Sequence, residues 1–316
     1  MTIFISVVGV LSLAFLLYAV RSLRIIGSKL SALQSQQSKS ARDMERQISN
    51  QRQTLKRITQ LQALPLVATE TRDWKFVVSL TSHAPRFHAL AQVLEGLKSQ
   101  VLQPQSILLN IAHKEISALP EKVKALADTG FIQIVGTDDL GPAKKLVPTL
   151  QSHKDQPIIV IDDDLEFDSE LCLHLMVQHY LFPKAIIASR VHQVTMNSND
   201  EVNSFDQWNK QYVESEGPAA DLMPTSGAGT LYPPQALHPD ATDADLYQQL
   251  SNFTDDLWWY FQGRRNGTLV RRLSGFSDLN FIESTQEAGL WKNGNLERNE
   301  SNLKNLLEKY GNPLKA

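Results

Sequence analysis

The sequence predicts an α/β fold in which a mostly parallel, Rossmann-like sheet is flanked by helices. After residue 72, short apolar runs rich in β-branched residues alternate with segments of helical spacing. Such alternation is typical of a parallel sheet covered on both faces. The chain has 316 residues, with a hydrophobic fraction of 42% and a charged fraction of 21%. These values are ordinary for a protein with a packed core.

The elements of this sheet follow one another along the chain. Buried strands are predicted at residues 76–80, 107–111, 131–135, 158–161 and 185–189, because each is a short apolar run. Helices are predicted at residues 90–100, 121–127, 142–150 and 171–180. Parallel sheets bind ligands beyond the carboxyl ends of their strands. The polar residues that follow each strand are therefore the candidate functional residues.

Residues 1–22 are predicted to form a transmembrane anchor. The run from Ile3 to Val20 carries no charge and would reach roughly 27 Å as a helix, close to the thickness of a bilayer's hydrocarbon core. It lacks the basic start and the small-residue cleavage site of a signal peptide, the competing interpretation. The basic residues Arg21, Arg24 and Lys29 follow the run. They predict a single-pass protein of the inner (cytoplasmic) membrane whose catalytic domain is cytoplasmic.

Two features bear on this topology. The lone cysteine, Cys172, cannot form an internal disulfide, which suits a reducing compartment. Asn-x-Ser/Thr sequons at Asn252, Asn266 and Asn299 would matter only if the domain faced a lumen. A lumenal enzyme with reversed topology is therefore the alternative.

Residues 23–72 are predicted to form a helical stalk, and residues 73–316 the α/β domain. The segment 30–64 has no Gly or Pro, and apolar residues such as Met44, Ile48 and Leu55 form a weak heptad series. A short coiled coil, through which the chain could form a homodimer, and a solvated single helix or flexible stalk are equally open. Pro65 ends the segment.

Three carboxylates, Asp162, Asp163 and Asp164, follow directly on the fourth predicted strand. Adjacent negative charges repel one another, and a cation would relieve that repulsion. Mg²⁺ and Mn²⁺ prefer oxygen ligands and keep open positions for phosphate oxygens. In an extended segment, Asp162 and Asp164 would point to one side and Asp163 to the other. The pattern favours a metal site over an acidic turn.

Two further segments carry candidate binding residues. In DDLGPAKKLVPTL (138–150), Lys144 and Lys145 follow a proline that suits a first helical turn. Near the positive end of the helix dipole they would suit a diphosphate; solvated surface lysines are the alternative. In PTSGAGTLYPP (224–234), Gly227 and Gly229 permit positive φ or close approach of a ligand to the backbone. A simple tight turn is the alternative.

The remaining candidates lie beside two other elements. In FTDDLWWY (253–260), Asp255 and Asp256 open a predicted helix with Thr254 as a candidate N-cap. Carboxylates are common at this position for electrostatic reasons alone, so catalysis and helix stabilisation are equally open. Arg190 and His192 follow the fifth predicted strand, where either could reach a ligand or be structural.

In this order and spacing, the motifs together resemble bacterial glycosyltransferases of the GT-A fold, of the family 2 type. VSLTSHAPRF (78–87) looks like the opening strand and turn, DLGPAKKLVPTL like the lysine-pair helix, and IIVIDDDLEF like the Asp-x-Asp strand. ASRVH, PTSGAGTLYPPQAL and TDDLWW look like the acceptor-side elements. The resemblance runs from about residue 74 to about residue 267. His83-Ala84 departs from the aromatic residue or proline that many relatives carry.

The resemblance implies a role for each candidate. Asp164 would bind the metal ion, Mn²⁺ or Mg²⁺, most directly, with Asp162 at the metal or the nucleotide ribose. Asp256, with Asp255 second, would be the catalytic base or a carboxylate that orients the sugar. Thr81 and Arg86 would border the nucleotide, and Lys144 and Lys145 would face the donor or its diphosphate. The further candidate binding residues are Asp163, Arg190 and His192. The wall near the transferred sugar would be formed by Gly227, Ala228 and Gly229.

The expected protein is a glycosyltransferase that moves a sugar from a nucleotide-sugar donor to a glycan or lipid-linked acceptor, in surface polysaccharide synthesis. A scaffold protein of the same fold, which binds nucleotide sugars or glycans without catalysis, is the alternative. The net charge of −3 predicts no broad attraction to nucleic acid.

Overall fold

The computed structural model describes residues 74–276, 279–282, 285 and 295–315, together with scattered helical positions between residues 27 and 59. The chain divides into two compact units, residues 1–55 and residues 56–316. The second unit contains the α/β fold and is described by itself.

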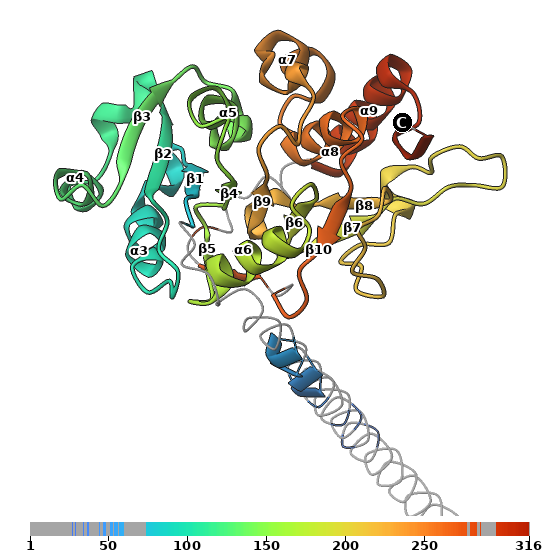
Figure 1. Ribbon diagram of the computed structural model, residues 1–316, viewed down its shortest axis with the longest axis horizontal. Helices are drawn as coiled ribbons and strands as arrows, with labels where there is room; N and C mark the ends of the chain where they lie inside the picture. The colour runs from blue at the N-terminus through green and yellow to red at the C-terminus, as the bar shows by residue number, and fades with distance from the viewer. Residues whose placement is uncertain are drawn as a thin grey trace, which may run out of the picture. The chain divides into compact units, whose positions relative to one another are not determined.

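A seven-stranded sheet in the order β10-β6-β9-β4-β1-β2-β3 forms the centre of this unit (Figure 1). Its strands are β1 (Val77–Thr81), β2 (Ser106–Ala112), β3 (Gln133–Thr137), β4 (Ile158–Val160), β6 (Ile186–Ala188), β9 (Thr230–Tyr232) and β10 (Val270–Arg272). β9 runs antiparallel to its neighbours β4 and β6, and the other pairs in the sheet are parallel. The predicted mostly parallel sheet is confirmed.

Helices cover both faces of the sheet. Successive strand residues point in opposite directions, so apolar side chains are present on both faces and both must be covered. Val78 and Leu80 belong to one hydrophobic core and Val77 to the other. The first core is covered by α3 (Phe87–Leu97), α4 (Glu121–Asp128) and α6 (Leu171–Leu181). The second is covered by α5 (Val147–Ser152), α7 (Ala244–Ser251), α8 (Asp255–Arg265) and α9 (Asn295–Tyr310).

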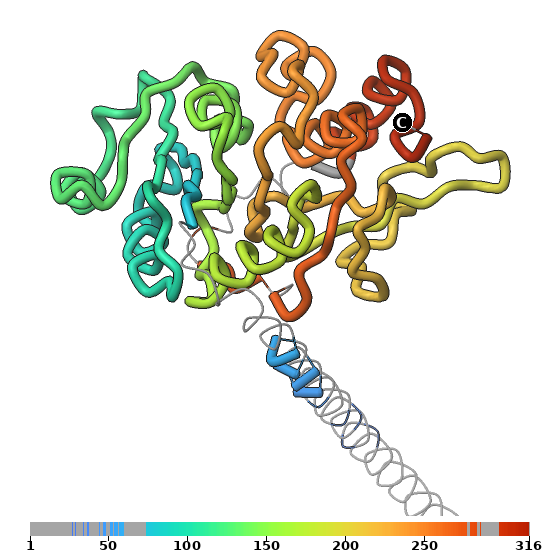
Figure 2. Tube along the Cα trace, in the orientation of Figure 1, coloured from blue at the N-terminus to red at the C-terminus, as the bar shows by residue number. Residues whose placement is uncertain are grey.

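Two small sheets and several 3₁₀ segments complete the unit. β5 (Leu165–Glu166) pairs with β11 (Asn280–Phe281), and β7 (Val191–Gln193) pairs with β8 (Leu222–Pro224). The chain between β7 and β8 makes a long excursion away from the central sheet, yellow in Figure 2. The 3₁₀ segments are η1 (Ala84–Arg86), η2 (His113–Ala118), η3 (Gly141–Lys145), η4 (Phe205–Gln207), η5 (Ser226–Ala228), η6 (Pro239–Thr242) and η9 (Pro313–Lys315).

The predicted helix at residues 142–150 is wrong. The segment consists of η3, a break at Leu146 with φ −128°, and the separate helix α5. Pro148 has no N–H to donate to the Lys144 carbonyl, so a helix begun at Pro142 cannot continue through it. Proline is tolerated in the first turn of a new helix, which is where Pro148 lies.

The membrane location is corrected. Residues 1–22, which carry that prediction, lie outside the described residues, and no helix in the described part of the chain is long and apolar enough to span a bilayer. The described positions between residues 27 and 59 are helical, and the stalk over residues 23–72 stays a prediction. The coiled coil, the homodimer and the domain boundary at residue 72 stay predictions.

Replacing Trp258 tests the second core. Its side chain is fully buried, its Nε1 donates to the Ala241 carbonyl at 3.0 Å, and its ring meets that of Tyr247 edge-on. We expect Trp258→Ala to lower the free energy of unfolding by about 3–5 kcal/mol in urea denaturation, because it leaves a large cavity. Val101→Ala is the control: the Val101 side chain is 64% exposed, so the change should stay within about 0.5 kcal/mol. Similar losses in both variants would contradict this packing.

Candidate functional site

The candidate site lies at one edge of the central sheet. The loops after β1, β4 and β6 meet there, because these strands run in the same direction. The segment before β9 reaches the same edge because β9 is antiparallel. Strand order also reverses between β1 and β4, the kind of crevice in which open α/β sheets bind ligands. A cavity of about 480 Å³ opens at this edge.

The aspartates after β4 form ion pairs with two basic residues. Lys145 Nζ lies 2.7 Å from Asp162 Oδ1, whereas Arg86 lies 2.8 Å from Asp163 Oδ1 and 3.1 Å from Asp164 Oδ2. The expectation that Asp163 would point away from both neighbours is wrong, since Asp163 and Asp164 share Arg86. The physical reason is that the chain turns at residues 163–164, so the side-chain alternation of an extended strand is lost.

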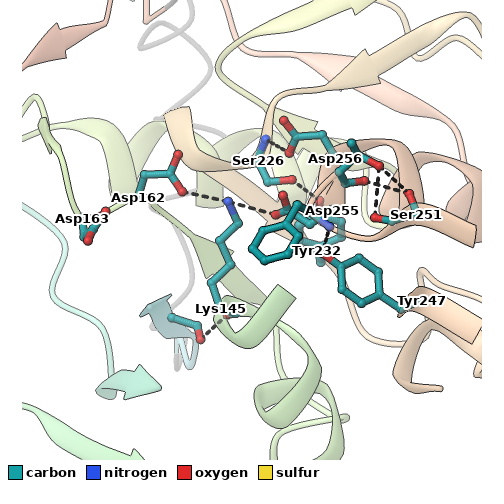
Figure 3. A network of polar contacts seen from close by, with 12 residues as sticks. Lys145, Asp162, Asp163, Ser226, Tyr232, Tyr247, Ser251, Asp255 and Asp256 are labelled. Atoms are coloured by element: carbon teal, nitrogen blue, oxygen red, sulfur yellow. Dashed lines mark hydrogen bonds and ion pairs between the residues drawn. The ribbon is translucent and has the colours of Figure 1, made fainter. Parts of the chain in front are cut away.

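Lys145 joins this turn to helix α8. Its buried ammonium lies between Asp162 and Asp255, with Asp255 Oδ2 at 3.0 Å (Figure 3). Burial alone would lower the pKa of Lys145, but the charges of Asp162, Asp255 and Asp256 outweigh it and hold the pKa well above its usual value. The lysine is therefore charged at every physiological pH.

The two lysines are not arranged as the sequence predicted. Both line the cavity, but they are buried in the last turn of η3 and do not open a helix, so the helix dipole gives them no role. Lys144 Nζ lies 2.8 Å from Asp139 Oδ1, and Lys114 Nζ lies 2.7 Å from Asp139 Oδ2. Both lysines of the pair are thus held by carboxylates of the chain itself.

Asp255 and Asp256 begin α8 and reach the cavity. Thr254 is the N-cap residue but makes no side-chain cap; its hydroxyl bonds to Ser251 instead. Asp256 Oδ1 accepts a 2.8 Å hydrogen bond from the Ser226 N–H (Figure 3). Burial, followed by the charge of Asp255, raises the pKa of Asp256 to about 6. Asp256 is therefore an unusually basic carboxylate that is still mostly ionised at pH 7.

Asp164 has a perturbed pKa as well. Burial and then the charge of Asp162 raise its pKa to about 7, although Arg86 and Lys145 act in the opposite direction. In the described structure the negative form of Asp164 is thus incompletely stabilised. An additional cation would stabilise it.

The two candidate glycines have different roles. A Cβ atom at Gly227 would overlap the Asp162 carboxylate, and the Asp162 N–H donates to the Gly227 carbonyl at 2.9 Å. Gly227 therefore permits the close approach of Asp162. Gly229 has φ +103°, its Cβ would lie 2.8 Å from Leu171 Cδ2, and it is not among the residues lining the cavity. The expectation that Gly229 forms the wall near a sugar is wrong, because it packs against α6; Ala228 does line the cavity.

Three further predicted residues line the cavity. The Thr81 hydroxyl donates to the Asn110 carbonyl at 2.6 Å. Arg190 Nη1 donates to Thr225 Oγ1 at 3.3 Å. His192 Nδ1 accepts a hydrogen bond from the Gln211 N–H at 3.1 Å, and burial lowers the pKa of His192 to about 3.

Several lining residues were missed in the sequence. They are Ser82, His83, Glu115, Asp139, Thr225, Phe253, Leu279, Phe281 and Asn299. Asp139 and Thr225 lie inside motifs already quoted, as do Ser82, His83 and Phe253, so membership of those motifs was a usable signal. Leu279, Phe281 and Asn299 lie far along the chain from the other lining residues, and no sequence motif near them indicated a site.

The cavity wall is acidic. Seven carboxylates and four Lys or Arg side chains line it. A diphosphate would add negative charge, so it needs a compensating cation to bind here. Across the residues described, no group of three or more His, Cys, Asp or Glu side chains is arranged to hold a metal ion.

No protein-family model matches the chain, and no curated protein matches it. Similar solved structures include S. aureus TarS 1–349 in complex with UDP, at 13% identity and a TM-score of 0.43 over 65% of this chain. A second is the 4-diphosphocytidyl-2C-methyl-D-erythritol synthase of Anaerococcus prevotii, at 14% identity and a TM-score of 0.42 over 71% of this chain and 95% of that one. A third is the glucosyl-3-phosphoglycerate synthase of Mycobacterium tuberculosis with Mn²⁺, UDP and glucosyl-3-phosphoglycerate. It has 12% identity and a TM-score of 0.29 over 37% of this chain and 43% of that one.

The chain spans about 60% of the TarS fragment that it matches. With TM-scores below 0.5, these similarities carry no argument about this chain. The function is argued below from the geometry of the cavity.

Gly227→Ala tests the close approach of Asp162. The added methyl group must displace the Asp162 carboxylate from Lys145. We expect the free energy of unfolding to fall by about 1–3 kcal/mol, as for overpacking elsewhere. Gly96→Ala is the matched control: it lies inside α3, and its Cβ would meet nothing within 4 Å. That change should raise stability by up to about 1 kcal/mol. Equal stabilities of the two variants would rule out the predicted clash.

Proposed function

We propose that the protein is a metal-dependent glycosyltransferase. It transfers a sugar from a nucleoside-diphosphate sugar to an acceptor hydroxyl, with a glycan as the acceptor class. The observation that supports this most directly is that two clusters of carboxylates line one cavity. One is Asp162 to Asp164 after β4, and the other is Asp255 and Asp256 at the start of α8. The first cluster suits a cation bound to phosphates, and the second contains Asp256, a carboxylate of raised pKa.

The residues present fit a hard divalent cation, Mg²⁺ or Mn²⁺. Asp164 and Asp162 are the candidate ligands, because the charge of Asp162 raises the pKa of Asp164 and a cation would relieve their repulsion. Mg²⁺ is commonly held by one or two carboxylates together with waters and substrate phosphates. Two carboxylates therefore suffice. When bound, the ion would offset the negative charge that gathers on the departing diphosphate.

The chain's own residues position the reacting groups. Arg86 holds Asp163 and Asp164, and Lys145 holds Asp162 and Asp255. These ion pairs fix the carboxylates before substrate binds, which lowers the cost of assembling the site.

Asp256 is our candidate general base. Its Oδ1 accepts a hydrogen bond from the Ser226 N–H, which fixes the orientation of the carboxylate. With a pKa of about 6, it is a stronger base than an ordinary aspartate and is ionised at pH 7. It can accept the proton of the acceptor hydroxyl as the new glycosidic bond forms.

Asp164→Asn tests the cation site. It removes one negative charge without changing shape, so we expect Mn²⁺-dependent release of nucleoside diphosphate from nucleotide sugars to fall about 100-fold or more. A panel of nucleoside-diphosphate sugars is assayed with and without Mn²⁺. Asp128→Asn, an exposed aspartate on α4, is the charge-matched control and should keep full activity. A folded Asp164→Asn protein with undiminished metal-dependent activity would refute the proposal.

The same assay separates the alternatives. Release of a nucleoside monophosphate together with a sugar phosphate would indicate nucleotidyl chemistry. Binding of nucleotide sugars without turnover of any would favour the catalytically inactive scaffold.

The pH dependence of transfer tests Asp256. Because the ionised form acts as the base and its pKa is raised to about 6, kcat/KM should be constant above about pH 7. Below about pH 6 it should fall about tenfold per pH unit. The measurement is made at saturating Mn²⁺, so that protonation of Asp164 does not contribute.

Two variants identify the group responsible. Asp256→Asn should abolish transfer at every pH. Asp255→Asn removes the charge that helps to raise the pKa of Asp256, so the acidic limb should move to lower pH. An unshifted limb in Asp255→Asn would assign it to another residue.

A further inference from the structure

Counting only the residues that the structure describes, one cation in the cavity wall has no carboxylate partner. Arg86, Lys144 and Lys145 each form an ion pair within 3.1 Å. Arg190 lines the same cavity but forms no ion pair with any residue that the structure describes. Its Nη1 has the 3.3 Å hydrogen bond to Thr225, and its buried Nε has no hydrogen-bond partner among the described residues. Even partial burial of a charge without a carboxylate partner is unfavourable, so this guanidinium calls for a functional explanation.

His192 adds a second donor at the same end of the cavity. Because its Nδ1 accepts from the Gln211 N–H, the neutral ring carries its proton on Nε2. Burial and the charges of Arg190 and Lys210 lower the pKa of His192, so the ring stays neutral and remains an N–H donor. This end of the cavity therefore offers hydrogen-bond donors of positive or neutral character.

The position of Arg190 relates this pair to the acceptor. Arg190 Nη1 donates to Thr225 Oγ1, and the N–H of the next residue, Ser226, holds Asp256 Oδ1. Arg190 is thus linked to the candidate base through two adjacent residues, whereas Arg86 pairs with Asp163 and Asp164 at the candidate cation site. An acceptor hydroxyl must reach Asp256, which places the rest of the acceptor beside Arg190 and His192.

We propose that Arg190 and His192 form a subsite for an anionic group on the acceptor, either a carboxylate or a phosphate. The planar guanidinium matches both groups with paired N–H donors. The acceptor class is therefore an acidic sugar or a sugar phosphate. This inference rests on the proposed function, and the test below separates the two.

A binding titration of the full chain in EDTA requires neither metal nor transfer. The probes are D-glucuronate for a carboxylate, D-glucose 6-phosphate for a phosphate and D-glucose as the neutral reference, followed by ligand-observed NMR. We expect at least one anion to bind about tenfold more tightly than glucose, and Arg190→Gln to remove that preference. Equal binding of all three sugars would overturn the subsite.

Lys122→Gln is the matched control, because it removes one positive charge from an exposed position on α4. It should bind the preferred anion as the wild type does. An equal loss in Lys122→Gln would show that the anion responds only to overall charge, which would also overturn the proposal.

Repeating the titration with saturating UDP and Mg²⁺ tells donor from acceptor. Simultaneous binding of UDP and the anion supports an acceptor subsite, whereas displacement of the anion by UDP would assign Arg190 to the donor and refute it. If UDP does not bind while the anion still depends on Arg190, the anion site stands and the proposed function fails.

Thermal melting without ligand provides an independent readout. Arg190→Gln removes a partly buried charge that has no carboxylate partner among the described residues, so its Tm should equal or exceed that of the wild type. A fall of more than about 4 °C, or failure to fold, would show a structural role for Arg190 and would overturn the inference.

Discussion

The ion pair of Lys145 with Asp162 and Asp255 is the interaction on which the candidate site depends. It connects the turn after β4 to the start of α8, two elements far apart in the sequence. Removing either carboxylate leaves the buried Lys145 ammonium with a single partner. Removing the lysine leaves Asp162 and Asp255 without their shared cation. Breaking a buried ion pair from one side is strongly destabilising, by about 3–5 kcal/mol. The Lys145 side chain therefore fixes the position of the turn after β4 relative to the start of α8.

The position of Lys145 is itself set by polar groups inside the sheet. The Ser79 hydroxyl donates to the Lys145 carbonyl at 2.6 Å and contacts the Thr149 hydroxyl at 2.7 Å. Asn110 Nδ2 lies 3.0 Å from the same Ser79 hydroxyl. All three side chains are fully buried, and hydrogen bonds shielded from water are electrostatically stronger than exposed ones. Strands β1 and β2 thus hold η3 in place, and η3 in turn presents the lysine.

Sequence reasoning succeeded where local pattern determines structure. Apolar runs identified the strands β1, β2, β3, β4 and β6, and the order of the motifs identified the edge at which they meet. It failed where tertiary contacts decide. β9 has only three residues between a glycine and a proline, and pairing with β4 and β6 makes it a strand. Gly229 looked like a ligand contact, but the packing of Leu171 explains it. The spacing of Asp162 to Asp164 could not show the turn that directs two of them to Arg86.

Besides His83 and His192, three carboxyl or guanidinium groups in the cavity are shifted toward their neutral forms by burial. Burial raises the pKa of Asp164 and of Asp256 and lowers that of Arg190. Each charged form is therefore less stable in the folded chain than in water, and each lowers the stability of the fold. Functional sites are where such unfavourable charges concentrate. A different ligand group would relieve each one: a cation at Asp164, the acceptor's proton at Asp256 and an anion at Arg190. Under the proposed function, the cation would bind beside the donor's phosphates, whereas the proton and the anion would both belong to the acceptor.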